Sequence, residues 1–240
     1  MAGVALVVFD MAGTTVRDDG VVLECFVAAA DAVGLVAGRD ELNARMGQSK
    51  LEVFEDLATR QLGAGDAAEK LAQNGFDAFR RILERVYVGG GVAPMPDSER
   101  VFAWLRERGI RIALNTGFYR AVTDQLVNAL GWRSLVDAVV CSDDVPRGRP
   151  APFLIHQAMQ RCDVWSVHEV IAVGDTPSDI GAGRNAGVAA VVAVSSGSHR
   201  AAELRRFHPT HLIRDVGELP RIVERLGRLT ARVFPNLNLG

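Results

Sequence analysis

The sequence predicts an α/β protein whose parallel β-sheet is interrupted by an inserted module of helices. The apolar run Val4–Phe9 ends at Asp10, a pattern typical of a strand that is buried on both faces. Residues 21–87 show a helical spacing of apolar side chains and no convincing strand. From Asp97 onward, short apolar runs alternate with helical patterns, which indicates βαβ units and hence a parallel sheet.

The inserted module is periodic and has a defined end. Leu51, Phe54 and Leu57 recur at the spacing of one helix face. Glycines occupy residues 89–91, where they form a flexible joint. We therefore expect two domains: a helical domain of residues 17–91, and an α/β core of residues 1–16 and 92–240.

The second part of the chain alternates regularly between helices and strands. The expected helices are Ser98 to Gly109, 120–130, 150–161, 178–186 and Leu219 to Arg232. The expected strands are Arg111–Leu114, Ala138–Cys141, Val170–Val173 and Ala189–Val194.

Composition excludes several classes of protein. A formal net charge of -2 gives no basic surplus, which argues against a nucleic-acid binder. Because no apolar run approaches the roughly 20 residues that span a bilayer, we expect a cytoplasmic protein without a membrane partner. Three widely spaced cysteines indicate buried free thiols rather than a disulfide framework or a zinc site.

Polar residues follow the strands at the edge of a parallel sheet where ligands bind. Asp10 is placed to be a nucleophile or a metal ligand, and Thr116–Gly117 offers a hydroxyl and free amides to a phosphoryl oxygen. Arg149 can bind phosphate through its guanidinium group. Asp175 and Asp179 supply the hard oxygen ligands that suit Mg²⁺. An ordinary turn or helix cap explains each motif alone, but their joint occurrence favours a phosphoryl site.

The order of these motifs resembles that of the haloacid dehalogenase superfamily of Asp-nucleophile hydrolases. The matching residues are Asp10 with Gly13–Thr14, Thr116–Gly117, Arg149–Pro150, and Gly174–Asp175 with Asp179. The resemblance implies a Rossmann-like core with an inserted cap domain, and an aspartyl-phosphate formed on Asp10. It also implies that Thr116, Gly117 and Arg149 bind the phosphoryl group. The metal ligands implied for Mg²⁺ are Asp10, the Ala12 carbonyl, Asp175 and, one shell out, Asp179.

Two departures from the common pattern narrow the resemblance. Phosphatases of this superfamily carry a general acid two residues after the nucleophile, whereas this chain has Ala12. Loss of a general acid costs about 10² to 10⁴ in rate on an alkyl phosphate ester. Arg149 also stands where most members carry lysine. Both features are the rule in the phosphonatase branch, the phosphonoacetaldehyde hydrolases.

The phosphonatase branch cleaves a carbon–phosphorus bond with the help of a lysine Schiff base. Its lysine lies in a Met-Gly-x-x-Lys motif of the cap, and this chain has Met46–Gly47 followed by Lys50. Lys50 and Lys70 are the two lysines of the sequence, so a lysine at this position does not reflect a lysine-rich surface. A guanidinium group cannot form an imine, so the chemistry requires lysine here. A solvated charge at a helix start is the alternative interpretation of Lys50.

One residue departs from the phosphonatase pattern itself. Members carry a histidine three residues after the lysine, and this chain has Val53. At a pKa of about 10.4 only about 0.04% of a lysine is neutral at pH 7, so burial or nearby cations must lower the pKa of Lys50.

These observations predict a Mg²⁺-dependent, phosphonatase-like hydrolase of phosphonoacetaldehyde or a related phosphonate. The alternatives are a phosphatase acting on another small phosphorylated metabolite, and a catalytically weak phosphate-binding protein. The resemblance also implies a homodimer formed through the cap.

Two further signals are interpreted as structural. Residues 181–186 spell a dinucleotide fingerprint, but they fall inside an expected helix, so close helix packing explains the glycines better. The histidines show no metal-binding pair and are expected at the surface or at strand ends; they are His156, His168, His199, His208 and His211.

Overall fold

The computed structural model describes residues 3–89 and 91–233 and confirms the predicted parallel α/β fold. Within these residues, one six-stranded sheet has the order β3-β2-β1-β4-β5-β6, and every neighbouring pair is parallel. The strands are β1 (Leu6–Asp10), β2 (Arg111–Asn115), β3 (Ala138–Val140), β4 (Val170–Gly174), β5 (Ala190–Val194) and β6 (His211–Ile213). The three-residue edge strand β6 was not predicted, because so short a segment shows no alternation.

Strand β1 lies in the middle of the sheet and is buried on both faces. Its alternate residues divide between two hydrophobic clusters, with Val7 and Phe9 in one and Leu6 and Val8 in the other. Because successive side chains point to opposite faces of a strand, each cluster covers one side of the sheet. The continuous apolar run that begins the sequence is therefore the centre of a three-layer core.

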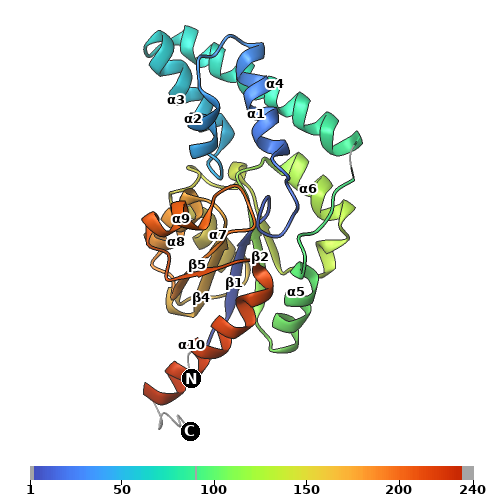
Figure 1. The fold of residues 1–240 in the computed structure, drawn as a ribbon, viewed down its shortest axis with the longest axis vertical. Helices are drawn as coiled ribbons and strands as arrows, with labels where there is room; N and C mark the ends of the chain where they lie inside the picture. The colour runs from blue at the N-terminus through green and yellow to red at the C-terminus, as the bar shows by residue number, and fades with distance from the viewer. Residues whose placement is uncertain (1–2, 90, 234–240) are drawn as a thin grey trace.

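Helices flank the sheet on both faces (Figure 1). The core helices are α5 (Ser98–Glu107), α6 (Arg120–Ala129), α7 (Phe153–Arg161), α8 (Pro177–Ala186), α9 (Ala201–Leu204) and α10 (Leu219–Val233). A Cβ atom on Gly183 of α8 would lie 2.8 Å from the Val191 side chain, so this glycine allows close packing on the sheet. Its position confirms that the fingerprint-like residues have a packing role.

Four helices occupy residues 21–89, all of which the structure describes. They are α1 (Val21–Ala32), α2 (Arg39–Ala44), α3 (Lys50–Leu62) and α4 (Asp66–Gly89). They lie together beyond the carboxyl end of β1 and stand apart from the sheet and its flanking helices (Figure 1). We propose that residues 17–91 form a cap domain, and that residues 1–16 and 92–240 form the core; residues 1–2, 90 and 234–240 of these ranges lie outside the described residues.

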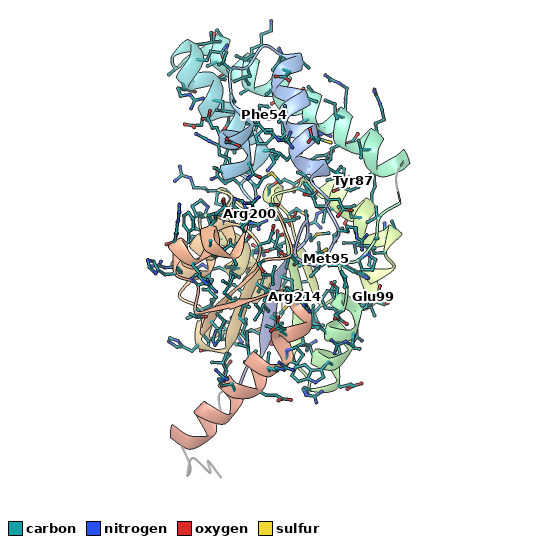
Figure 2. All side chains as sticks on the ribbon, in the orientation of Figure 1. Phe54, Tyr87, Met95, Glu99, Arg200 and Arg214 are labelled. Atoms are coloured by element: carbon teal, nitrogen blue, oxygen red, sulfur yellow. The ribbon has the colours of Figure 1, made fainter. Side chains whose placement is uncertain are left out.

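Aromatic rings form the centre of the cap. The Phe26 ring meets the Phe54 ring edge to face at 5.1 Å and the Phe79 ring at 6.0 Å. Figure 2 shows Phe54 within this group of helices. Gly75 of α4 lies against Phe54, where an added Cβ atom would come within 2.7 Å of the ring. Helices α3 and α4 therefore approach closely because residue 75 has no side chain.

Two crossover segments, residues 15–20 and 91–97, connect the cap to the core and pair with each other. The Arg17 N–H donates to the Ala93 carbonyl at 3.0 Å, and the Met95 N–H donates to the Thr15 carbonyl at 2.7 Å. Figure 2 shows Met95 below the cap, near the junction.

Two further expectations can be compared with the structure. The three cysteines, all among the described residues, are buried free thiols, as predicted. In residues 3–89 and 91–233, no helix has both the length and the apolar character that crossing a membrane requires.

Replacing Gly75 by alanine tests the close packing of the cap. Alanine favours a helix by about 1 kcal/mol over glycine, yet its methyl group would overlap the Phe54 ring. We expect Gly75→Ala to lower the free energy of unfolding by about 1–3 kcal/mol in urea denaturation. The control Asn74→Ala changes an exposed neighbour in the same helix and should shift the free energy of unfolding by less than about 0.5 kcal/mol. A Gly75→Ala protein as stable as this control would contradict the packing argument.

Candidate active site

Asp10 ends β1 and is held with one carboxylate oxygen free. It is buried, and Arg149 Nη1 donates to its Oδ1 at 2.8 Å. Among the described residues, Oδ2 of Asp10 accepts no hydrogen bond. The following loop is tight, since the Thr15 hydroxyl donates back to the Asp10 carbonyl at 2.8 Å. The loop therefore presents a fixed carboxylate with one open oxygen at the carboxyl edge of the sheet.

Arg149 is a fully buried guanidinium group with two unused nitrogens. Its Nη1 pairs with Asp10 and also with Asp179. Its Nε and Nη2 are buried and have no hydrogen-bond partner within the part of the chain that the structure describes. Buried donors without a partner are costly, so a ligand that accepts both hydrogen bonds is expected here. A phosphoryl group fits, because two of its oxygens can accept from one guanidinium fork.

Three carboxylates form a buried acidic group. One oxygen from each of Asp10, Asp175 and Asp179 lies within 4.8 Å of the others. Burial, and then the charge of Asp10, raises the pKa of Asp175 to about 7. The charged form of Asp175 is therefore disfavoured by its burial and by the neighbouring carboxylate of Asp10. Oxygen donors of this kind suit a hard divalent cation such as Mg²⁺, so the residues present could hold a metal ion.

Asp175 and Asp179, the two members of the acidic group that lie beside Asp10, are each held in place by hydrogen bonds from a neighbouring loop. The Ser198 N–H donates to Asp175 Oδ2 at 2.7 Å, and the Thr14 hydroxyl donates to Oδ1 at 3.2 Å. Asp179 forms a capping box with Thr176 at the start of α8, where Asp179 Oδ2 accepts from the Thr176 N–H at 3.0 Å. Asp179 therefore orients Arg149 and caps α8 at the same time, which agrees with a place outside the inner ligand shell.

Thr116 and Gly117 follow β2 at the same edge of the sheet. Thr116 is buried, and its hydroxyl oxygen accepts a hydrogen bond from the Phe118 N–H at 3.1 Å. A Cβ atom on Gly117 would lie 2.7 Å from the Gln48 carbonyl of the cap. The glycine is therefore needed where the cap touches the core.

The segment 46–52 of the cap, which we call the docking loop, lies directly on the strand-end loops. The Gly148 N–H of the core donates to Glu52 Oε1 at 2.6 Å. A Cβ atom on Gly148 would come within 2.8 Å of Ser49, and one on Gly47, at a φ of +80°, would collide with Thr176. Small residues on both sides thus bring the two backbones into contact.

Lys50 begins α3 and is buried at the bottom of the docking loop. Its side chain is 4% exposed, and its Nζ lies 5.0 Å from the centre of the Phe26 ring. Burial, and then the nearby charge of Arg149, lowers the pKa of Lys50 to about 8. Its one hydrogen bond among the described residues is a long one of 3.4 Å to the Gln48 carbonyl. Val53, three residues further along α3, is buried in the hydrophobic cluster of the cap.

Most of the residues predicted from the sequence line one small cavity. Its volume is about 20 Å³, which is room for roughly one water molecule. The predicted residues that line it are Asp10, Ala12, Met46, Gly47, Lys50, Thr116, Gly117 and Arg149. Asp175 and Asp179 do not line it and instead lie against Asp10. A cavity of this size is smaller than a phosphoryl compound.

Sequence reasoning missed several residues at this site. Glu52, Ser198 and Asp18 had no recognisable motif, and the Arg-Asp-Asp-Gly segment containing Asp18 is typical of an exposed turn.

One prediction about the histidines was wrong, because His199 is buried. Burial lowers the pKa of His199, against an opposing effect of Glu203. The loop after β5 that carries Ser198 and His199 folds over Asp175, which local sequence does not reveal.

This combination of fold and site defines a class of hydrolase. Residues 4–187 match the family model of the haloacid dehalogenase-like hydrolases. The chain belongs to the haloacid dehalogenase-like hydrolases, and the resemblance drawn from its motifs is confirmed.

Particular relatives narrow this assignment to one branch. The chain is 32% identical over 193 residues to phosphonoacetaldehyde hydrolase from Bacillus cereus, covering 76% of this chain and 72% of that relative. Its fold matches a phosphonoacetaldehyde hydrolase like protein from Oleispira antarctica, with a TM-score of 0.80, 23% identity, and coverage of 96% and 95%. A hydrolase from Pseudomonas syringae matches with a TM-score of 0.81 and 19% identity, over 93% and 99% of the two chains.

The burial of Lys50 predicts a pH-dependent stability. Its pKa of about 8 in the folded protein lies below the ordinary 10.5, so the unfolded chain binds more protons between these two values. The buried ammonium destabilises the protein fully below about pH 8, and this penalty disappears as the pH rises to about 10.5. We expect Lys50→Met to be the more stable protein at pH 7, and its advantage to shrink by about 3 kcal/mol across that window.

Urea denaturation at pH 7, 8, 9 and 10 measures this difference. The control Lys70→Met replaces an exposed lysine and should differ from the wild type by a constant amount. A Lys50→Met difference that is equally constant would contradict the proposed cost of burying Lys50.

Proposed function

We propose that this protein is a Mg²⁺-dependent, phosphonatase-like hydrolase that cleaves the carbon–phosphorus bond of phosphonoacetaldehyde or a closely related carbonyl phosphonate. One observation carries the proposal: a buried lysine, Lys50, lines the same small cavity as Asp10. The residue at position 12, beside the nucleophile, is alanine, so the usual acid for a phosphate ester is missing there. An amine facing a nucleophilic carboxylate supplies a different way to activate the leaving group.

The phosphoryl group is bound by the core. Arg149 offers Nε and Nη2, which have no protein partner among the described residues. The Thr116 hydroxyl and the Gly117 amide add donors at the end of β2. The free oxygen of Asp10 then faces phosphorus. Asp10, the Ala12 carbonyl and Asp175 would hold Mg²⁺, with Asp179 one shell out, and a bound Mg²⁺ would offset negative charge on the nucleophile and phosphoryl oxygens.

Lys50 supplies the electron sink. Its neutral amine adds to the aldehyde carbon, and the adduct takes up a proton from water and loses its hydroxyl group as water, which leaves a protonated imine. Asp10 Oδ2 then bonds to phosphorus while the carbon–phosphorus electron pair moves into the imine, which becomes a neutral enamine. The enamine takes a proton at carbon and is hydrolysed by water, which releases the aldehyde and the amine of Lys50. A second water hydrolyses the aspartyl-phosphate and releases phosphate and the Asp10 carboxylate.

The environment of Lys50 suits this role. At a pKa of about 8, about a tenth of the lysine is neutral at pH 7, compared with about 0.04% for an unperturbed lysine. Burial and the charge of Arg149 therefore lower the pKa of Lys50. Val53, which stands where the phosphonatase branch has a histidine, cannot contribute to this lowering.

The cavity favours a small substrate with one anionic group. Arg149 and Lys50 are the cations that line it, and Lys50 must be neutral to react. Val22, Met46 and Phe118 make up an apolar wall. A second carboxylate on the substrate would meet no further cation, so a short carbonyl phosphonate fits best. We also infer a cytoplasmic enzyme that forms a homodimer through its cap, as the resemblance to the phosphonatase branch suggests.

Replacing Lys50 by arginine tests the Schiff base. Arginine keeps the charge but cannot form an imine, so we expect phosphate release from phosphonoacetaldehyde to fall by about 10³-fold or more. Borohydride reduction with the aldehyde present should add mass at Lys50 of the wild type. The control Lys70→Arg changes an exposed lysine and should keep full activity. Equal rates for wild type and Lys50→Arg would refute the imine, and faster turnover of phosphate esters than of the phosphonate would favour a phosphatase.

Replacing Asp175 by asparagine tests the metal site. The change keeps the shape of the side chain but removes a negative charge from the buried acidic group, so we expect Mg²⁺ to bind at least about tenfold more weakly in calorimetry. The control Asp143→Asn removes an exposed carboxylate at another strand end and should leave Mg²⁺ affinity unchanged. An unchanged affinity in Asp175→Asn would argue against this metal site.

A further inference from the structure

Helix α4 of the cap faces the core with one row of side chains that the proposed mechanism does not use. Phe76, Arg80, Glu84 and Tyr87 recur every three or four residues, so they lie on the same face of the helix. Helix α6 of the core lies below this part of α4 (Figure 1), and Figure 2 shows Tyr87 near the junction of cap and core. The row therefore meets the segment that connects β2 to α6.

Tyr119, the N-cap residue of α6, receives most of these side chains. It is 7% exposed, and its hydroxyl donates a hydrogen bond to Glu84 Oε1 at 2.6 Å. Its ring meets the Phe76 ring edge to face at 6.0 Å, and the Arg80 guanidinium group lies 4.7 Å from its centre. Hydrogen bonds to a carboxylate are among the stronger ones in proteins. One side chain of the core thus makes a polar contact, an aromatic contact and a cation–π contact with the cap.

Phe118, the residue before Tyr119, connects these contacts to the small cavity. Its ring lies 6.3 Å from the Tyr87 ring, and the residue also lines the cavity that contains Lys50. Its N–H donates to the Thr116 hydroxyl at 3.1 Å, and its carbonyl accepts from the Ser142 N–H at 3.0 Å. The backbone of Phe118 is therefore fixed to the core on both sides, while its ring lies between α4 and the cavity.

The contacts of Tyr119 differ in kind from those of the crossover segments. The crossover segments are joined by backbone hydrogen bonds, such as that from the Arg17 N–H to the Ala93 carbonyl. The contact between α4 and Tyr119 is made by side chains, as is the carboxylate contact of Glu52 in the docking loop with the Gly148 N–H. Side-chain contacts can separate by rotamer changes that leave the backbone pairing of the crossover intact.

Two polar groups beside Tyr119 are poorly satisfied in this arrangement. Arg80 Nε and the Tyr87 hydroxyl are buried, and neither has a hydrogen-bond partner within residues 3–89 and 91–233. A buried polar group without a partner costs free energy that water would restore if the contact opened. The Tyr119–Glu84 hydrogen bond therefore opposes a tendency of its own surroundings to separate.

We propose that Tyr119, Phe76, Arg80 and Glu84 form a latch that holds the cap over the small cavity, and that its Tyr119–Glu84 hydrogen bond breaks when the cap moves to admit a compound larger than the cavity. Tyr119 is in this sense a positioning residue, because it acts on Lys50 and Asp10 only through the placement of the cap. The latch does not depend on the chemistry proposed for Lys50, since any compound that is bound between cap and core has to enter in the same way.

A simpler role for Tyr119 is to fill space between α4 and α6. Phenylalanine separates the two roles, because it keeps the ring that packs against Phe76 and Arg80 but removes the hydroxyl. Glu84→Ala removes the acceptor from the other side of the same hydrogen bond. Arg81→Gln, an exposed neighbour on α4, is the matched surface control. Gly75→Ala, which weakens the packing of the cap away from the latch, is the control for unfolding of the cap.

The test uses the two lysines of the chain as reporters of access. Lys50 is 4% exposed and lies under the cap, whereas Lys70 is exposed on α4. Each variant is acetylated at pH 8 with sulfosuccinimidyl acetate, a reagent much larger than the cavity of about 20 Å³, and mass spectrometry follows the acetyl group at each lysine over time. The rate at Lys50 relative to Lys70 measures how often the cap opens.

Loss of the hydrogen bond should raise this relative rate about tenfold in Tyr119→Phe and in Glu84→Ala. The double variant Tyr119→Phe/Glu84→Ala should be no faster than either single variant, because both changes remove the same interaction. Arg81→Gln should match the wild type.

Two results would overturn the latch. The first is acetylation of Lys50 in Tyr119→Phe at the wild-type rate. The second is an equal acceleration in Gly75→Ala, which would mean that the reagent reaches Lys50 through unfolding of the cap. Acetylation requires no imine, so this test and the borohydride test of the Schiff base can fail independently of each other.

Discussion

The buried guanidinium group of Arg149 is the interaction on which the rest of the site depends. It contacts Asp10 at the end of β1 and Asp179 at the start of α8, so it fixes these two carboxylates relative to each other. A lysine at this position would bring a single ammonium nitrogen. The planar fork of arginine holds two carboxylates through Nη1 and still presents Nε and Nη2 to a ligand. This geometry gives a physical reason for arginine at a position where most of the superfamily carries lysine.

The contact between cap and core brings Lys50 into the same space. Gly117 and Gly148 leave room for the backbone of the docking loop, and Glu52 binds the Gly148 amide. Lys50 is part of this loop and lines the cavity where the loop contacts the core. Its low exposure is thus a consequence of docking, and so is the lowered pKa that makes an amine available near neutral pH. The same contact excludes water from the imine that we propose.

The residues at the strand ends could be predicted because the signal for each lies in a short stretch of sequence. In each stretch an apolar run stops and a reactive residue follows. Asp10, Thr116, Arg149 and Asp175 were identified in this way, and so was Lys50 from its motif. Asp18 could not be identified, because its burial depends on how the cap packs over the crossover segment. His199 was assigned wrongly because the loop that carries it folds over Asp175, a contact between segments that are distant in sequence.

The buried acidic group and Lys50 lie on opposite sides of Asp10, one in the core and one in the cap. Burial, and then the charge of Asp10, raises the pKa of Asp175 to about 7, so a buried carboxylate of the acidic group lacks a compensating cation among the described residues. A divalent cation beside Asp175 would supply this compensation on the core side of the cavity. In the reaction that we propose, the core side of the cavity binds the phosphoryl group and Lys50 on the cap side carries the iminium charge. A carbon–phosphorus bond placed between these two sides would be polarised from both ends, which is the feature that our proposed reaction requires.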